Sequence, residues 1–177
     1  MTVQNHGELH QNDGYRPNVG IILVNRYNQV LWARRASHDG WQFPQGGVRH
    51  DESPKDALFR ELYEEVGLDP KHVEIVAHTQ SWLRYDLPEP YLARLRRRGN
   101  NTFRGQKQLW YLLRLIASDS EVCLDTCDKP EFDKWIWLDW WNALEQIVEF
   151  KREVYESAMR ELVWHLPRNA FFPRLFP

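Results

Sequence analysis

The sequence predicts an α/β protein in which a mixed sheet is flanked by helices. Two observations lead to this fold class. Short β-branched and aromatic runs bounded by turn residues indicate strands, and two longer stretches with apolar residues at helical spacing indicate helices. One central and one terminal helix interleave with the strands, an order that favours helices packed on a sheet. The 177 residues are enough for one domain with a real core.

The strands are predicted from apolar runs too short to be buried helices. A turn at 25–28 separates the first two, which predicts a hairpin. The last predicted strand carries large apolar side chains on both of its faces, which leaves open which face is inside. The predicted strands are 19–24, 30–33, 73–77, 109–116 and 132–138.

Helices are predicted at 54–66 and 151–165, with a shorter one at 140–150. The first has clear boundaries. Ser53 is a predicted N-cap with Pro54 in the first turn and Asp56 at the capping-box position, and Gly67 supplies the left-handed residue that ends the helix.

Composition narrows the class of protein. No apolar run is long enough for a membrane helix, and residues 1–12 are polar and lack the apolar core of a signal peptide, so we expect a cytoplasmic chain without a membrane partner. Cys123 and Cys127 are too few for a disulfide framework and are expected to be reduced thiols. The net charge of −2 excludes a uniformly basic nucleic-acid binder, and no DNA partner is expected. The predicted organisation is a polar tail at 1–12, one domain at 13–166 and a C-terminal tail at 167–177.

Three carboxylates share one side of the central helix. Glu61, Glu64 and Glu65 lie at i, i+3 and i+4 and repel one another, with Arg60 at the edge of the stripe. Hard divalent cations prefer such oxygen ligands, so metal binding is one interpretation of this pattern. A solvated acidic face or an ion-pair network is the other.

The residues upstream of this helix favour the metal interpretation. The pattern G-x5-E-x7-R-E-U-x-E-E-x-G-U, in which U is aliphatic, is matched at all nine fixed positions, which by chance has a probability on the order of 10⁻⁷. The matching residues are Gly46, Glu52, Arg60, Glu61, Leu62, Glu64, Glu65, Gly67 and Leu68. This pattern resembles the Nudix box. The resemblance implies the Nudix fold, an α/β/α sandwich around a mixed sheet, and hydrolysis of a nucleoside diphosphate linked to another moiety with magnesium or manganese.

The resemblance also implies roles for the residues of the box. Glu61, Glu64 and Glu65 correspond to metal ligands, and the Gly46 carbonyl to a further contact with the metal. Glu52 and Arg60 correspond to an ion pair that supports the site, and Gly47 to a tight turn. The general base is left open among Glu64, Glu65 and, outside the box, Glu131.

Segments outside the box point to the substrate. Seven of them resemble segments of bacterial RNA pyrophosphohydrolases: residues 14–20, 32–35, 41–47, 81–85, 105–108, 130–133 and 150–152. These Nudix enzymes convert 5′-triphosphate or 5′-diphosphate RNA ends to monophosphates and thereby initiate mRNA decay. Hydrolases of dinucleoside polyphosphates such as diadenosine tetraphosphate share many of these segments and are the alternative. A nucleotide- or RNA-binding regulator without catalysis is a third hypothesis, which the intact carboxylates oppose.

A basic segment favours a polyanionic substrate. Residues 84–107 carry seven basic side chains against two acidic ones, and we expect them to form a loop that contacts phosphates. The expected substrate contacts are Arg16, Arg35, Tyr85, Lys107, Val148, Phe150 and Lys151; forked guanidinium groups suit terminal phosphates, and an aromatic ring suits an unpaired base. Ion pairs for the arginines and core packing for Phe150 are the alternatives. We expect a monomer, and the resemblance implies an activating protein partner in part of the family.

Overall fold

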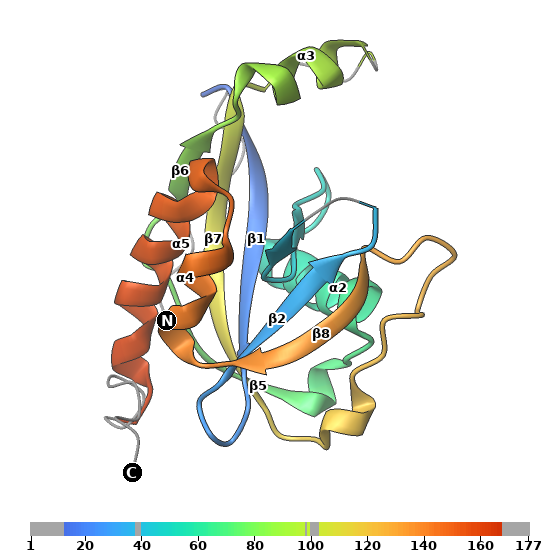
Figure 1. Cartoon of the computed structure of the whole chain (residues 1–177), viewed down its shortest axis with the longest axis vertical. Coiled ribbons are helices and arrows are strands. Elements are labelled where there is room, and N and C mark those ends of the chain that lie inside the picture. The colour runs from blue at the N-terminus through green and yellow to red at the C-terminus, as the bar shows by residue number, and fades with distance from the viewer. Residues whose placement is uncertain (1–12, 38–39, 98, 100–102, 168–177) are drawn as a thin grey trace.

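The computed structural model describes residues 13–37, 40–97, 99 and 103–167 (Figure 1). The strands are β1 (Tyr15–Val24), β2 (Val30–Arg35), β3 (Trp41–Gln42), β4 (Gln45–Gly47), β5 (Val73–His78), β6 (Leu83–Asp86), β7 (Gly105–Leu115) and β8 (Phe132–Leu138). The α-helices are α2 (Pro54–Val66), α3 (Glu89–Arg97), α4 (Ala143–Gln146) and α5 (Glu149–Leu162). Short 3-10 helices lie at Pro70–His72, Asp119–Glu121, Trp140–Asn142 and Val163–His165.

The sheet is mixed, as predicted. Its main path runs β3-β2-β1-β7-β5, with β4, β6 and β8 paired to β1, β7 and β2 respectively. β1 and β7 run parallel from Tyr15↔Gly105 to Val24↔Arg114, whereas the other pairings are antiparallel. The predicted hairpin is confirmed by the β1–β2 pairing of Val24 with Val30.

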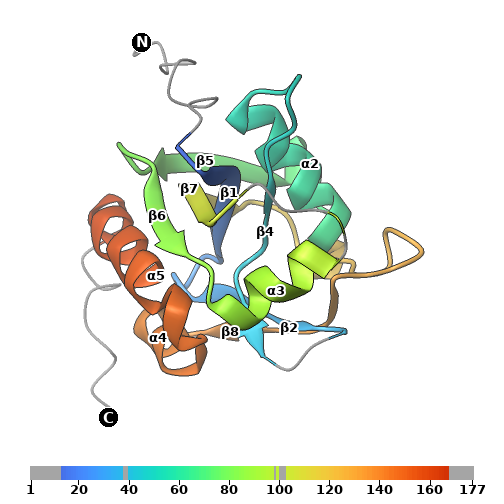
Figure 2. The same cartoon turned by 90° about the horizontal axis from the view of Figure 1, so that it is seen from above.

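Helices cover both faces of the sheet (Figures 1 and 2). Along β1 the side chains alternate, as the pleat requires: Ile22 joins the core beneath α5, while Ile21 and Leu23 join the core beneath α2. Trp135 and Trp137 of β8 pack toward the α2 core and Ile136 toward the α5 core, so both faces of that strand are covered. The α/β sandwich expected from the sequence is therefore the observed architecture.

Helix α2 has the predicted bounds, and the other helices differ from the prediction. The terminal helix begins two residues earlier, at Glu149, and its last turn is a 3-10 helix. In place of the short helix expected at 140–150, a 3-10 turn leads into α4, and Phe150 belongs to α5.

The basic segment at 84–107 is not a loop, which corrects the expectation. It holds β6, the helix α3 and the first residues of β7. Helix α3 has no buried residue and projects from one end of the sheet (Figure 1). Tyr91, Leu92 and Leu95 recur at helical spacing, but over only nine residues, four of them charged, this spacing does not distinguish a helix from a loop.

Three further expectations concern the two tails, the cysteines and membrane-spanning helices. The predicted tail at 1–12, and all of the 167–177 tail beyond residue 167, lie outside the described residues. Cys123 and Cys127 are exposed and form no disulfide with each other. Among the described helices, none is long and apolar enough to cross a membrane.

Candidate active site

Helix α2 is fixed at both ends by the residues that predicted it. The Ser53 side chain accepts a hydrogen bond from the Asp56 amide and the Asp56 side chain accepts one from the Ser53 amide, which completes a capping box. Gly67 adopts φ 72° and its amide donates to the Tyr63 carbonyl. Leu58, Leu62 and Val66 are fully buried against the sheet, which fixes the rotation of the helix and so the direction of its carboxylates.

Arg60 holds three of these carboxylates with one guanidinium group. Its Nε and Nη2 donate to the two oxygens of Glu52 at 3.0 and 2.6 Å, and its Nη1 donates to Glu61 Oε1 at 2.6 Å and Glu64 Oε2 at 3.1 Å. Nη2 also donates to the Gly47 carbonyl at 2.8 Å, which ties the helix to β4. The cluster keeps a surplus of negative charge, since one cation faces three acids; Arg49, 3.5 Å from Glu64, is a second, more exposed cation.

Glu65 is buried close to another carboxylate, that of Glu61. Only 8% of its surface is exposed, and its Oε2 accepts a hydrogen bond from the Gln45 amide at 2.9 Å. Burial first, and the Glu61 carboxylate second, raise the pKa of Glu65 well above its ordinary value. Burial also raises the pKa of Glu61 despite its ion pair with Arg60. Both shifts mean that a further positive charge at this place would be favourable.

The two glycines of β4 bring backbone against charged side chains. A Cβ at Gly46 would overlap the Glu61 carboxyl group, and a Cβ at Gly47 would overlap the Arg16 guanidinium group. The sequence predicted only a tight turn at Gly47. The structure shows instead that both positions are in β4 and are close approaches between β4, α2 and β1.

The donor set fits a divalent cation. Glu61, Glu64, Glu65 and the Gly46 carbonyl offer the oxygen ligands that magnesium prefers, and the glycine leaves the room that a side chain would fill. In the described part of the chain, no three acidic, histidine or cysteine side chains already converge as a metal site. The reason lies in the contacts above: Arg60 takes Glu61 and Glu64, while Glu65 turns to the Gln45 amide.

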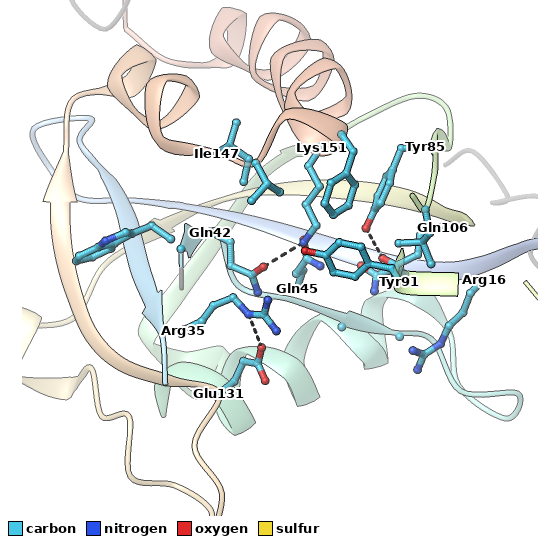
Figure 3. Close-up of a pocket in the computed structure, with 18 of the residues that line it drawn as sticks. Arg16, Arg35, Gln42, Gln45, Tyr85, Tyr91, Gln106, Glu131, Ile147 and Lys151 are labelled. Atoms are coloured by element: carbon cyan, nitrogen blue, oxygen red, sulfur yellow. Dashed lines mark hydrogen bonds and ion pairs between the residues drawn. The ribbon is translucent and has the colours of Figure 1, made fainter. Parts of the chain in front are cut away.

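A pocket of about 670 Å³ opens beside these residues (Figure 3). This volume is typical of sites for small ligands and is enough for one nucleotide with its phosphates. Ten of the residues predicted for the site line it: Arg16, Arg35, Gly46, Gly47, Glu65, Tyr85, Glu131, Val148, Phe150 and Lys151.

Four cationic residues line this pocket, and the three predicted from the sequence, Arg16, Arg35 and Lys151, differ in their partners. The Arg16 guanidinium makes no ion pair with any described residue. Arg35 Nε donates to Glu131 Oε1 at 3.3 Å, so this arginine has an acidic partner. Lys151 Nζ donates to Gln42 Oε1 at 3.1 Å, and burial, followed by the nearby Arg35 charge, lowers the pKa of Lys151 to about 8. The combination suits a multiply charged anion.

Not every predicted contact reaches the pocket. Lys107 is fully buried and is not among the lining residues; its Nζ lies 3.1 Å from Asp13 Oδ2. Successive strand residues point to opposite faces, so Gln106 lines the pocket and Lys107 points away from it. The structure therefore opposes the expected substrate contact at Lys107. The lining also lacks four other predicted site residues: Glu52, Arg60, Glu61 and Glu64.

Sequence reasoning missed several lining residues. Gln42, Gln45 and Gln106 present amides, and Tyr91 and Arg94 extend from α3. Tyr85 Oη donates to Gln106 Oε1 at 2.7 Å and Tyr155 Oη to Gln45 Oε1 at 3.0 Å, so the amides are held in place. The alternation of Gln106 with Lys107 was a readable signal for the amide; nothing short of the fold placed α3 at the rim.

Comparison with known proteins identifies the class. The model of the NUDIX domain matches residues 14–158, most of the chain, which therefore belongs to the Nudix family. The protein is a Nudix hydrolase that acts on pyrophosphate bonds.

Similar solved structures show the same fold. The E. coli dihydroneopterin triphosphate pyrophosphohydrolase is 20% identical, with a TM-score of 0.64 over 83% of this chain and 98% of that one. A C. elegans Ap4A hydrolase in a binary complex is 15% identical, with a TM-score of 0.61 over 85% and 99%. A MutT protein from Methanosarcina mazei is 20% identical, with a TM-score of 0.54 over 83% and 94%. At these identities the likeness concerns the fold and leaves the substrate open.

Proposed function

We propose that the protein is an RNA 5′-pyrophosphohydrolase that converts 5′-triphosphate or 5′-diphosphate ends to 5′-monophosphates. The observation that carries this proposal is the composition of the pocket. It joins three cations, Arg16, Arg35 and Lys151, to the aromatic ring of Phe150 directly beside the Nudix glutamate Glu65. The resemblance of the flanking segments to RNA pyrophosphohydrolases points the same way.

The cations divide the work of holding the phosphates. Arg16 has no acidic partner among the described residues and can form two hydrogen bonds to a terminal phosphate. Arg35 and Lys151 are restrained by Glu131 and Gln42 and can hold an inner phosphate without reorganisation. The phosphoanhydride is thereby aligned with Gly46 and Glu65.

The first nucleoside is assigned to the apolar side of the pocket. Val148 is 38% exposed and Phe150 is half-buried, and both line the cavity next to Lys151. An unpaired base can stack on the Phe150 ring, as single-stranded RNA does on aromatic side chains elsewhere. The Tyr85 ring also lines the pocket, and its centroid lies 6.0 Å from that of Phe150.

The α2 carboxylates are assigned to a divalent cation, magnesium or manganese. Glu61, Glu64, Glu65 and the Gly46 carbonyl would hold it, and the cation would neutralise phosphate charge and lower the pKa of a water. Arg60 and Glu52 orient these carboxylates through the hydrogen bonds described above.

Glu131 is proposed as the general base. It lines the pocket, and it is near enough to Glu65 for its charge to raise the pKa of that residue further. Its hydrogen bond with Arg35 fixes the orientation of the carboxylate, which can then accept a proton from an attacking water. Glu64 and Glu65 are the competing assignments.

A direct assay tests the function. Purified protein with magnesium is given a 5′-triphosphate RNA labelled at the γ- and β-phosphates, with Glu64→Gln as the matched blank. The expected result is release of pyrophosphate or phosphate and a 5′-monophosphate RNA by the wild type only. An RNA that stays triphosphorylated would refute the proposal.

Hydrolysis of dinucleoside polyphosphates is the second candidate. The same pocket would receive diadenosine tetraphosphate, with its aromatic side chains holding an adenosine. The fold is shared with a C. elegans protein described as an Ap4A hydrolase. A much larger kcat/KM for diadenosine tetraphosphate than for RNA would select this alternative.

A further inference from the structure

Helix α3 is an unusual element, because it is present in the fold without contributing to the core. None of its nine residues is buried, and it stands clear of the two packed layers (Figures 1 and 2). A helix this short is marginal in water without packing. Stabilising the fold therefore does not explain why this helix lies at the pocket.

The helix forms part of the pocket rim. Tyr91 and Arg94 both line the pocket, and Figure 3 shows the Tyr91 ring directed into it. The Tyr91 and Phe150 ring centroids are 5.1 Å apart at an angle of 54°. Tyr91 nevertheless keeps 39% of its surface exposed, so it offers an aromatic surface to whatever enters the pocket.

Positive charge continues outward from this ring. The Arg94 guanidinium lies 5.8 Å from the Tyr91 ring centroid, and Arg97 is its neighbour one turn along the helix. Neither arginine forms an ion pair within the described part of the chain, whereas Arg96, on another side of the helix, pairs with Glu89 at 2.6 Å. Two cations without an ion pair among the described residues thus follow the aromatic ring along α3: Arg94 at the pocket rim and Arg97 one turn further along.

The pocket and the proposed substrate differ in size. A volume of about 670 Å³ suits one nucleotide, so the rest of an RNA must leave across the rim. We propose that α3 is the docking arm for that RNA: Tyr91 stacks a base at the pocket mouth, and Arg94 and Arg97 contact the phosphodiester phosphates that follow. This inference rests on the proposed RNA substrate and adds the residues that would favour an RNA over a free nucleotide.

The test compares substrates of two lengths that share one 5′ end. The kcat/KM is measured for a 5′-triphosphorylated eight-nucleotide RNA and for the corresponding nucleoside triphosphate, over a range of salt concentrations. The variants are Tyr91→Ala, Tyr91→Phe, Arg94→Ala and Arg97→Ala. The turn between β1 and β2, at the opposite end of the sheet, supplies a matched control: Arg26 lies 4.8 Å from the ring centroid of exposed Tyr27, and Arg26→Ala removes the same charge there.

We expect Tyr91→Ala to lower kcat/KM for the RNA about tenfold. Tyr91→Phe should keep the wild-type kcat/KM, because stacking needs only the aromatic ring. Each arginine variant should reduce the salt slope by about 0.7, the value for one phosphate of a single strand. All of these losses should be larger for the RNA than for the nucleotide. Unchanged melting temperatures, expected since no residue of α3 belongs to the buried core, exclude an effect on folding.

The outcomes separate this inference from the proposed function. If the wild type does not convert the RNA, the proposed function fails and the docking arm with it. If the wild type converts the RNA but the α3 variants behave like Arg26→Ala, the function stands and the docking arm is refuted. Equal losses on both substrates would also refute it, because a docking arm acts only on the longer one.

Discussion

Replacing Arg60 by methionine should lower the stability of the fold much more than the same replacement of an arginine in an exposed ion pair. Arg60 donates five hydrogen bonds, to Glu52, Glu61, Glu64 and the Gly47 carbonyl. Methionine fills much of the same volume but leaves those acceptors without their donor. Among the described residues, the substitution thus removes the one guanidinium that contacts all three carboxylates.

The magnitude follows from burial. The side chains of Arg60 and Glu52 are 17% and 13% exposed, and breaking such a pair costs roughly 3–5 kcal/mol because a charge is left without its partner in a poorly hydrated place. For a chain of this size, 1 kcal/mol shifts the melting temperature by about 2–4 °C, so we expect Arg60→Met to melt about 6–20 °C lower. Arg34 supplies the control, because its bidentate pair with Asp133 is similar but its side chains are 46% and 42% exposed. Arg34→Met should cost about 1 kcal/mol or less.

Urea unfolding of both variants, followed by tryptophan fluorescence and repeated across pH, provides the measurement. The Arg60 guanidinium lowers the pKa of Glu52, so the stability from this pair is present above the ordinary pKa of 4.5 and is lost as the pH falls through the lowered value. The difference between the wild type and Arg60→Met should therefore shrink below about pH 4.5. Equal losses for Arg34→Met and Arg60→Met at pH 7 would refute the reasoning.

Three further predictions concern the pocket. Because the pKa of Lys151 is lowered to about 8, its positive charge is present below that pH and lost above it. The kcat/KM for an anionic substrate should therefore fall from pH 7 to 9, and Lys151→Arg should remove the fall. A flat pH profile of the wild type would contradict this prediction. Gly46→Ala should lower kcat at least tenfold with little change in circular dichroism, because the new Cβ forces the Glu61 carboxyl group to move; full activity would show that the close approach is irrelevant. Glu131→Gln should lower kcat by about 10²–10⁴ with a smaller change in KM if it is the general base, and a pure KM effect, expected if it only restrains Arg35, would transfer that role to an α2 glutamate.

The core of the fold could be predicted because its signals are local. The caps of α2 and the β1–β2 turn each lie within a few residues of the element they bound, and the alternation along β1 follows from the pleat. Helix α3 could not be predicted in this way, because none of its residues is buried in the core and its apolar residues recur over only nine positions, four of them charged, which is too short a stretch for the helical period to stand out.

The site residues likewise include some that local sequence patterns predict and others whose positions depend on the whole fold. The spacing of Glu61, Glu64 and Glu65 placed them on one side of the helix, and the match of the whole box, from Gly46 to Leu68, favoured their interpretation as metal ligands. What spacing did not reveal is that Glu65 is buried and that Arg60 bridges Glu61 and Glu64, because both facts depend on how β4 covers the helix. The expected contact at Lys107 fails for a similar reason: the strand pleat, rather than proximity in sequence, decides which side chains reach the pocket.

A competition assay tests the proposed function most directly. Equal amounts of labelled 5′-triphosphate RNA and diadenosine tetraphosphate are mixed with the protein and magnesium, and pyrophosphate, phosphate, ATP and AMP are followed over time, with Glu64→Gln as the blank. The account predicts that RNA is converted to its 5′-monophosphate faster than ATP and AMP are formed. Faster release of ATP and AMP would contradict it and would assign the pocket to dinucleoside polyphosphates.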